Sequence, residues 1–175
     1  MTWTTHHNRG QLLREIETVT AERRDGLLPM DLDGVAVVFD DEMDILAALQ
    51  LRWYTRLAGM IERELFDAPD ANLEAAVIHA WHLTNDELPG VRAVLDHYAA
   101  NPVNDLMRQQ LATGRLKEHH LLALMAGLGG YGHELSIAVG GRLEERAREA
   151  YISAAQLAEV HERVTILDRV RALVA

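Results

Sequence analysis

Three polar side chains stand at positions where helical spacing predicts apolar ones. Gln50 and Glu64 interrupt the apolar arc of the segment 41–66, and Glu118 lies near the centre of the apolar stripe of a later segment. That stripe consists of Met107, Leu111, Gly114, Leu121, Leu122 and Met125. A buried polar group must find a hydrogen-bonding partner. Gln50, Glu64 and Glu118 are therefore the candidate ligand-binding residues of the chain.

Inward carboxylates on two helices have two chemical interpretations. Glu64 and Glu118 could ligate metal ions, as in carboxylate-bridged di-metal bundles. They could equally form buried ion pairs, and Arg23 is a candidate partner because it lies on the apolar stripe of its own segment. The ion pair is the favoured interpretation, since a lone buried carboxylate usually pairs with an arginine. Ferritin-like di-iron bundles also carry Glu-x-x-His on two helices, and no histidine here has a glutamate three residues before it.

The histidines offer a weaker metal-binding pattern. His79, His82 and Asp86 are separated by three and four residues, which can place three ligands on one helix face. That face lies opposite the apolar stripe that contains Val77, so we expect these side chains to face water. His119 and His120 flank the stripe of their segment, and adjacent residues cannot point in one direction. No metal or other cofactor is therefore expected.

A glycine-rich run satisfies the Gly-x-Gly-x-x-Gly spacing of dinucleotide-binding loops. In that fold the run follows a strand of a parallel sheet, whereas the run at 127–132 follows a helical pattern, and no parallel sheet is predicted elsewhere. We therefore interpret it as a turn between two helices with left-handed glycines. His-Glu-x-x-His and a nucleophile elbow are also absent, so the sequence leans away from an enzyme.

Composition narrows the classes of partner. The 175 residues are 49% hydrophobic, which fits one globular domain covering 1–175. With 17 basic against 27 acidic residues the net charge is −10, which disfavours nucleic acid and anionic membrane surfaces. The chain has no cysteine, and no apolar run approaches the roughly 20 residues of a membrane span. We expect a cytoplasmic protein.

The segment from about 41 to 66 is predicted to be the central helix. Asp40 or Asp41 is a suitable N-cap, and the helix dipole favours the acidic residues of the first turn. Two adjoining apolar lines run along it: Leu46, Leu49, Trp53, Leu57 and Met60, and beside them Ala47, Leu51, Tyr54, Ala58, Ile61 and Leu65. So wide an apolar arc predicts packing on two sides, inside a bundle or at a subunit interface.

Helical patterns fill most of the remaining chain. They cover residues 11–24, 72–100, 101–126, 133–151 and a last segment that opens with Ser153. Pro89 predicts a kink or a split in the second of these, and Asn101-Pro102 predicts the start of the third. The apolar run 35–39 has no strand to pair with, so it is expected to form a short helix or an extended piece on the core.

The sequence thus predicts an all-α fold, a mainly antiparallel bundle of five or six helices. Two functions remain open. The favoured one is a binding or protein–protein interaction module that forms a homodimer or higher oligomer, because of the two-sided arc. The alternative is a metal- or small-molecule-binding bundle that uses Gln50, Glu64 and Glu118 in an interior pocket.

Overall fold

The computed structural model describes residues 3–67 and 72–151. Within these residues the chain is all-α, as predicted, with no strand. The elements are α1 (Trp3–Arg23), α2 (Val35–Val38), α3 (Glu42–Asp67), α4 (Leu73–Glu87), α5 (Pro89–Ala100), α6 (Asp105–Met125), a 3-10 turn η1 (Gly129–Tyr131) and α7 (His133–Ala150). The segment predicted to open at Ser153 lies outside the described residues. No helix of the described part is long and apolar enough to cross a membrane.

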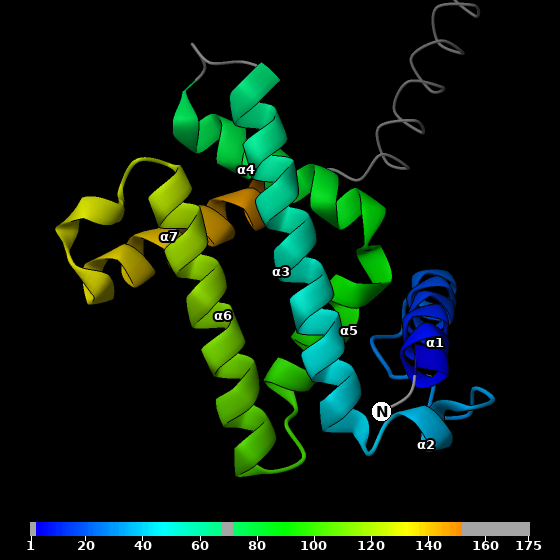
Figure 1. Ribbon diagram of the computed structural model, residues 1–175. Helices are drawn as coiled ribbons and strands as arrows, with labels where there is room; N and C mark the ends of the chain where they lie inside the picture. Colours follow the sequence, from blue (N-terminus) through cyan, green and yellow to red (C-terminus); the bar gives the residue numbers. More distant parts are fainter. Residues whose placement is uncertain (1–2, 68–71, 152–175) are drawn as a thin grey trace, which may run out of the picture.

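Helix α3 is central, as predicted. Asp41 caps its start, because the Asp41 carboxylate accepts a hydrogen bond from the Asp44 N–H at 2.9 Å. The first apolar line of α3 is fully buried, and the helix contacts α1, α4, α5 and α6. Figure 1 shows α3 beside α6, with the N-terminal end of each at the bottom of the view. These two helices are the walls of the site described below.

The second apolar line of α3 is only partly covered. Ile61 is buried, whereas Leu51 is 67% exposed and Ala47 is also exposed. One side of the wide arc therefore packs in the core, and the other side lies at the surface of the monomer.

Pro89 splits the predicted 72–100 segment into α4 and α5, with Leu88 between them. Proline suits the first helical position of α5, where its missing N–H has no helical partner to lose. The following Gly90 lies against α1, and an added Cβ would come within 2.3 Å of the backbone at Thr20 and Ala21. Close contact between α1 and α5 therefore depends on this glycine.

Helix α6 begins later than predicted. The prediction placed its start at Asn101, but Asn101 ends α5, with its N–H donating to His97 O at 2.9 Å. The true N-cap is Asn104, which accepts from the Met107 N–H at 2.8 Å. Two asparagines three residues apart offer equal caps to a sequence pattern, and the structure uses the second.

The glycine-rich run forms a turn between helices, as interpreted from its context. Gly127 has φ 75° and follows the end of α6. The Leu128 N–H donates to Ala123 O at 2.8 Å and the Gly127 N–H donates to Leu124 O at 3.1 Å, which is the hydrogen-bond pattern of a Schellman motif. The turn sends the chain back as α7, whose Gly140 lies so close to His119 O that an added Cβ would be 1.8 Å away. The backbones of α6 and α7 are therefore in close contact at this point.

Two other elements differ in length from their predictions. Helix α1 starts at Trp3, well before the predicted 11. The apolar run 35–39 forms the four-residue α2, followed by extended Phe39, and both Val35 and Phe39 are buried. The expectation that this run docks on the core as a short helix is confirmed.

Candidate functional site

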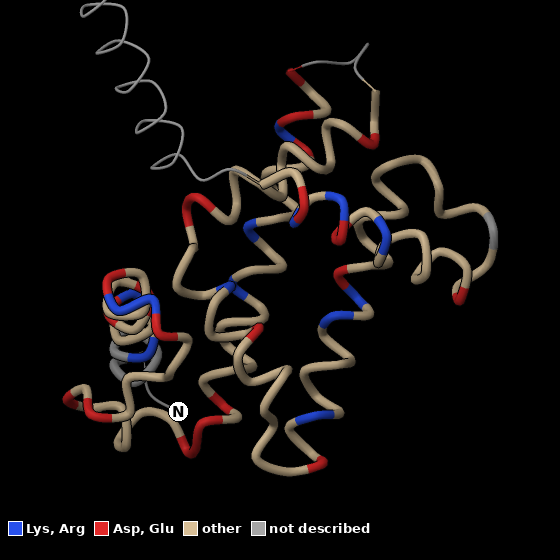
Figure 2. Tube along the Cα trace, turned by 180° about the vertical axis from the view of Figure 1, so that it is seen from behind, with Lys and Arg blue, Asp and Glu red and all other residues tan. Residues whose placement is uncertain are grey.

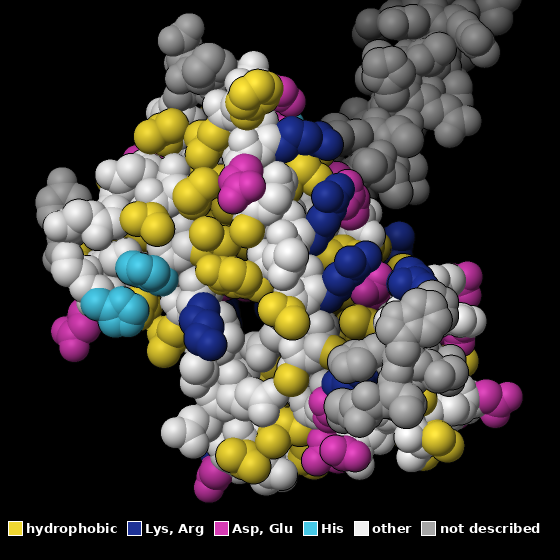
Figure 3. Space-filling view, viewed as in Figure 1, with side chains coloured by type: hydrophobic (Ala, Val, Ile, Leu, Met, Phe, Trp, Pro, Cys, Tyr) yellow, Lys and Arg dark blue, Asp and Glu magenta, His cyan; other side chains and the backbone are white. Residues whose placement is uncertain are grey.

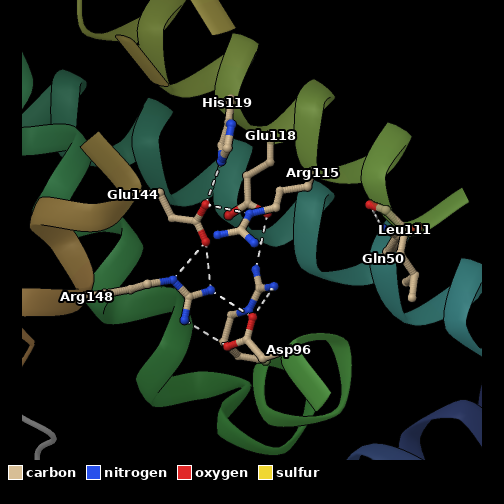
Figure 4. Close-up of polar contacts among 9 residues, drawn as sticks. Gln50, Asp96, Leu111, Arg115, Glu118, His119, Glu144 and Arg148 are labelled. Atoms are coloured by element: carbon tan, nitrogen blue, oxygen red, sulfur yellow. Dashed lines mark hydrogen bonds and ion pairs between the residues drawn. The ribbon is translucent and has the colours of Figure 1, made fainter. Parts of the chain in front are cut away.

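Charged side chains from α5, α6 and α7 converge inside the molecule. Figure 2 shows basic and acidic positions close together where these helices meet. The residues that form this cluster, called here the ion-pair network, are Arg92, Asp96, Arg115, Glu118, His119, Glu144 and Arg148. Figure 4 draws these contacts. Asp96 binds both Arg92 on α5 and Arg148 on α7.

Glu118 pairs with an arginine, as the favoured interpretation expected, but the partner is not Arg23. Arg92 donates to Glu118 Oε2 at 3.2 Å and to Asp96 Oδ1 at 2.8 Å. Its guanidinium also lies 4.9 Å from the centroid of the Trp53 ring, within range of a cation–π contact. Arg23 instead binds Asp31 at the surface. The partner lies on α5, 26 residues from Glu118.

Glu144 is the most enclosed charge of the network, with 1% of its surface exposed. It accepts hydrogen bonds from His119 Nε2 at 2.6 Å, from Arg115 at 3.1 Å and from Arg148 at 2.7 Å. Burial alone would raise the pKa of Glu144, but the hydrogen bond from His119 and the neighbouring arginines lower that pKa far below its usual value. Glu144 therefore stays ionised.

The sequence analysis missed Glu144, although a signal was present. Gly140, Leu143, Glu144 and Ala147 have the spacing of one helix face, and all four are buried. Glu145 and the arginines around it make the segment resemble a solvated helix, which hides this signal.

Asp96 and Arg148 form a further ion pair of the network. Two hydrogen bonds of 2.8 Å connect them, and the Arg148 guanidinium lies 5.4 Å from the centroid of the Trp81 ring. Burial acts to raise the pKa of Asp96, yet Arg148 and Arg92 lower it overall. The pKa of Arg148 is raised, since Asp96 and Glu144 outweigh the effect of its burial. Asp96 and Arg148 therefore carry their charges at neutral pH.

A cavity of about 800 Å³ lies beside the network, between α3, α5 and α6. Figure 3 shows a hollow between the surfaces of α3 and α6, with a basic side chain at its edge. Leu51, Leu95 and Leu111 contribute apolar wall, while Trp53 and Tyr54 contribute aromatic rings. The charged lining residues are Arg92, Arg108, Arg115, Lys117 and Glu118.

Three buried residues of this lining hold polar atoms without a hydrogen-bond partner. They are Trp53 Nε1, Arg92 Nε and Glu118 Oε1, and their side chains are each more than nine-tenths buried. The first two are donors and the third is an acceptor. All three atoms are buried from solvent, so they lie behind the surface of the cavity wall.

The structure brings two of the three candidate residues to the cavity. Gln50 and Glu118 line it, and Gln50 donates to Leu111 O at 3.1 Å while packing against Gly114. Glu64 is not among the lining residues. Its carboxylate accepts from His79 Nδ1 at 2.7 Å and lies 3.8 Å from Arg63. Glu64 and Glu118 thus have different partners.

The histidine pattern on α4 does not form a metal site. His79 and Asp86 are exposed as expected, but His82 is half-buried and donates to Ala147 O at 2.8 Å, so the expectation that it faces water was wrong. Tyr151 donates to Asp86 at 2.8 Å. Across residues 3–67 and 72–151, no group of three or more His, Cys, Asp or Glu is arranged to hold a metal ion.

Comparison with known proteins adds no relative. No family model matches the chain, and neither a curated protein nor a solved structure is similar to it.

Proposed function

We propose that the protein binds a small organic molecule in the cavity between α3, α5 and α6. This is the small-molecule branch of the alternative function that the sequence left open. The volume of about 800 Å³ falls in the range of ligand pockets, roughly 300 to 1,000 Å³. The lining combines apolar and aromatic side chains with polar and charged ones.

The mixed lining of the cavity carries the proposal. Apolar and aromatic groups of Leu95, Leu111 and Trp53 lie beside the amide of Gln50 and the charged groups of Arg92 and Glu118. A ligand with an apolar body and a polar group can contact both kinds of surface. Ordered water is the competing occupant.

The proposal does not extend to a metal or to a reaction. Glu64 and Glu118, the candidate metal ligands, bind different partners, and the Glu118 carboxylate already faces Arg92. Whether the protein is an enzyme stays open, with the sequence leaning away from one, and the cytoplasmic location stays an expectation.

Fluorescence of phenylnaphthylamine, a neutral dye that brightens in apolar cavities, tests the proposal. The dye should bind the wild type saturably, and Ala99→Trp should block it, because Ala99 is exposed and lines the cavity. The adjacent Ala100 is exposed on the same helix and does not line the cavity, so Ala100→Trp is the matched control and should bind normally. Absence of saturable binding, or equal binding by both variants, would indicate a cavity filled by water only.

A homodimer is the second candidate, favoured by one observation. Large apolar side chains are exposed on α3 and α6: Leu51 at 67%, Phe66 at 84%, Leu106 at 60% and Leu124 at 54%. Figure 3 shows hydrophobic groups gathered over these two helices. Contiguous exposed apolar surface typically marks an interaction site. Light scattering at micromolar concentration tests the oligomer, and a strict monomer would contradict it.

A further inference from the structure

We infer that the ligand of the α3–α5–α6 cavity is an organic monoanion with an apolar body. The inference rests on the proposed function and adds the charge of the ligand. It is carried by the distribution of charge around the cavity.

The cavity wall is basic in an acidic protein. Four basic residues and one acidic residue line it, although the whole chain has a net charge of −10. An excess of positive charge along the lining repels a cationic ligand and attracts an anion.

Three of the four basic residues already have a carboxylate partner. Arg92 pairs with Glu118, Arg108 with Asp105, and Arg115 with Glu144 at 3.1 Å. Each of these positive charges is therefore largely compensated within the protein.

Lys117 is the exception. It is exposed on α6, lines the cavity and has no ion-pair partner among the residues that the structure describes. It is also the only lysine of the chain. One uncompensated positive charge at the cavity matches a ligand with one negative charge. The long, flexible lysine side chain can bring its ammonium group to the anion.

The rest of the wall determines the ligand body. Leu51, Leu95 and Leu111 offer apolar surface, and the rings of Trp53 and Tyr54 suit a flat aromatic or alicyclic body. An inorganic anion would leave this apolar wall unfilled. An amphipathic carboxylate or sulfonate uses both parts of the lining.

A pair of dyes with the same aromatic body tests the charge. Anilinonaphthalene sulfonate carries a sulfonate that phenylnaphthylamine lacks, and both brighten in apolar cavities. At low ionic strength the anionic dye should bind the wild type about tenfold more tightly, a difference of about 1.4 kcal/mol. High salt should reduce this preference, because exposed Lys117 is screened.

Variants of Lys117 assign the preference to one residue. Lys117→Glu should weaken the anionic dye about tenfold or more and leave the neutral dye unchanged. Lys117→Arg should preserve the preference. Arg142→Glu makes the same change of charge at an exposed position of α7 that does not line the cavity, and it should bind both dyes like the wild type.

The outcomes separate the two proposals. If both dyes bind equally and Ala99→Trp blocks both, the cavity is a binding site but the inference about charge is wrong. If the anionic dye is preferred and Lys117→Glu leaves the preference intact, the assignment to Lys117 is wrong. If Ala99→Trp and Ala100→Trp bind both dyes alike, the dyes bind outside the cavity and both proposals fail.

Discussion

Arg92 donates a hydrogen bond to Glu118 at 3.2 Å, and both side chains are less than a tenth exposed. This pair joins the ion-pair network to the cavity, because both residues line the cavity and Arg92 also binds Asp96. The ion pair therefore fixes the side chains of two residues of the cavity lining.

Glu118→Leu should destabilise the protein by about 3 kcal/mol, because removing one partner leaves the buried Arg92 charge with only Asp96. Urea unfolding measures the loss. The double variant Arg92→Met with Glu118→Leu removes both buried charges and should recover most of the stability. A Glu118→Leu protein as stable as the wild type would mean that the carboxylate is merely tolerated.

The pH dependence of stability should have a steep acid limb. Folding lowers the pKa of both Asp96 and Glu144. Above about pH 5 both carboxylates are ionised in the folded and unfolded chains, so their contribution is complete. Below about pH 4 the unfolded chain binds protons that the folded chain does not, and stability falls as the pH falls. Thermal melts across this range measure the slope.

Glu144→Gln should make that acid limb shallower and lower stability at neutral pH, since Arg115, His119 and Arg148 lose the negative charge that they share. Glu145→Gln is the matched control, because Glu145 is the exposed neighbour on α7. An acid limb with the same slope in Glu144→Gln and the wild type would show that other carboxylates control it.

Gly140→Ala should destabilise the protein by about 3 kcal/mol through overpacking, because the new Cβ would lie 1.8 Å from His119 O. Gly59→Ala is the control: Gly59 lies within α3 with nothing within 4 Å of an added Cβ. Alanine there should stabilise by up to about 1 kcal/mol through helix propensity. If Gly140→Ala also stabilised, α6 and α7 would not be in the close contact described.

Leu124→Glu should shift the proposed homodimer toward monomer, because it places a charge on the exposed apolar surface of α6. Val37→Glu is the control, since Val37 is 89% exposed on α2, away from that surface. Sedimentation or light scattering at equal concentrations compares them. Equal oligomeric states for the wild type and both variants would place any interface elsewhere.

The sequence by itself determined the helices and the places where their patterns break. A cap at Asp40 or Asp41, a kink or split at Pro89 and the glycine turn after α6 all follow from local chemistry, within a few residues of chain. The inward position of Glu118 follows from the same helical period. Such features are local, so a pattern can predict them.

Only the tertiary structure decided the partners. Arg92 rather than Arg23 binds Glu118, and His79 binds Glu64, because partner choice depends on how helices cross and how closely they approach. Close approach depends in turn on Gly90 and Gly140 meeting particular backbones. The cavity arises in the same way: Gln50 and Glu118 reach one space and Glu64 does not. The helical period of a sequence indicates only the face of the helix on which a side chain lies. It does not indicate which residues of other helices that side chain meets.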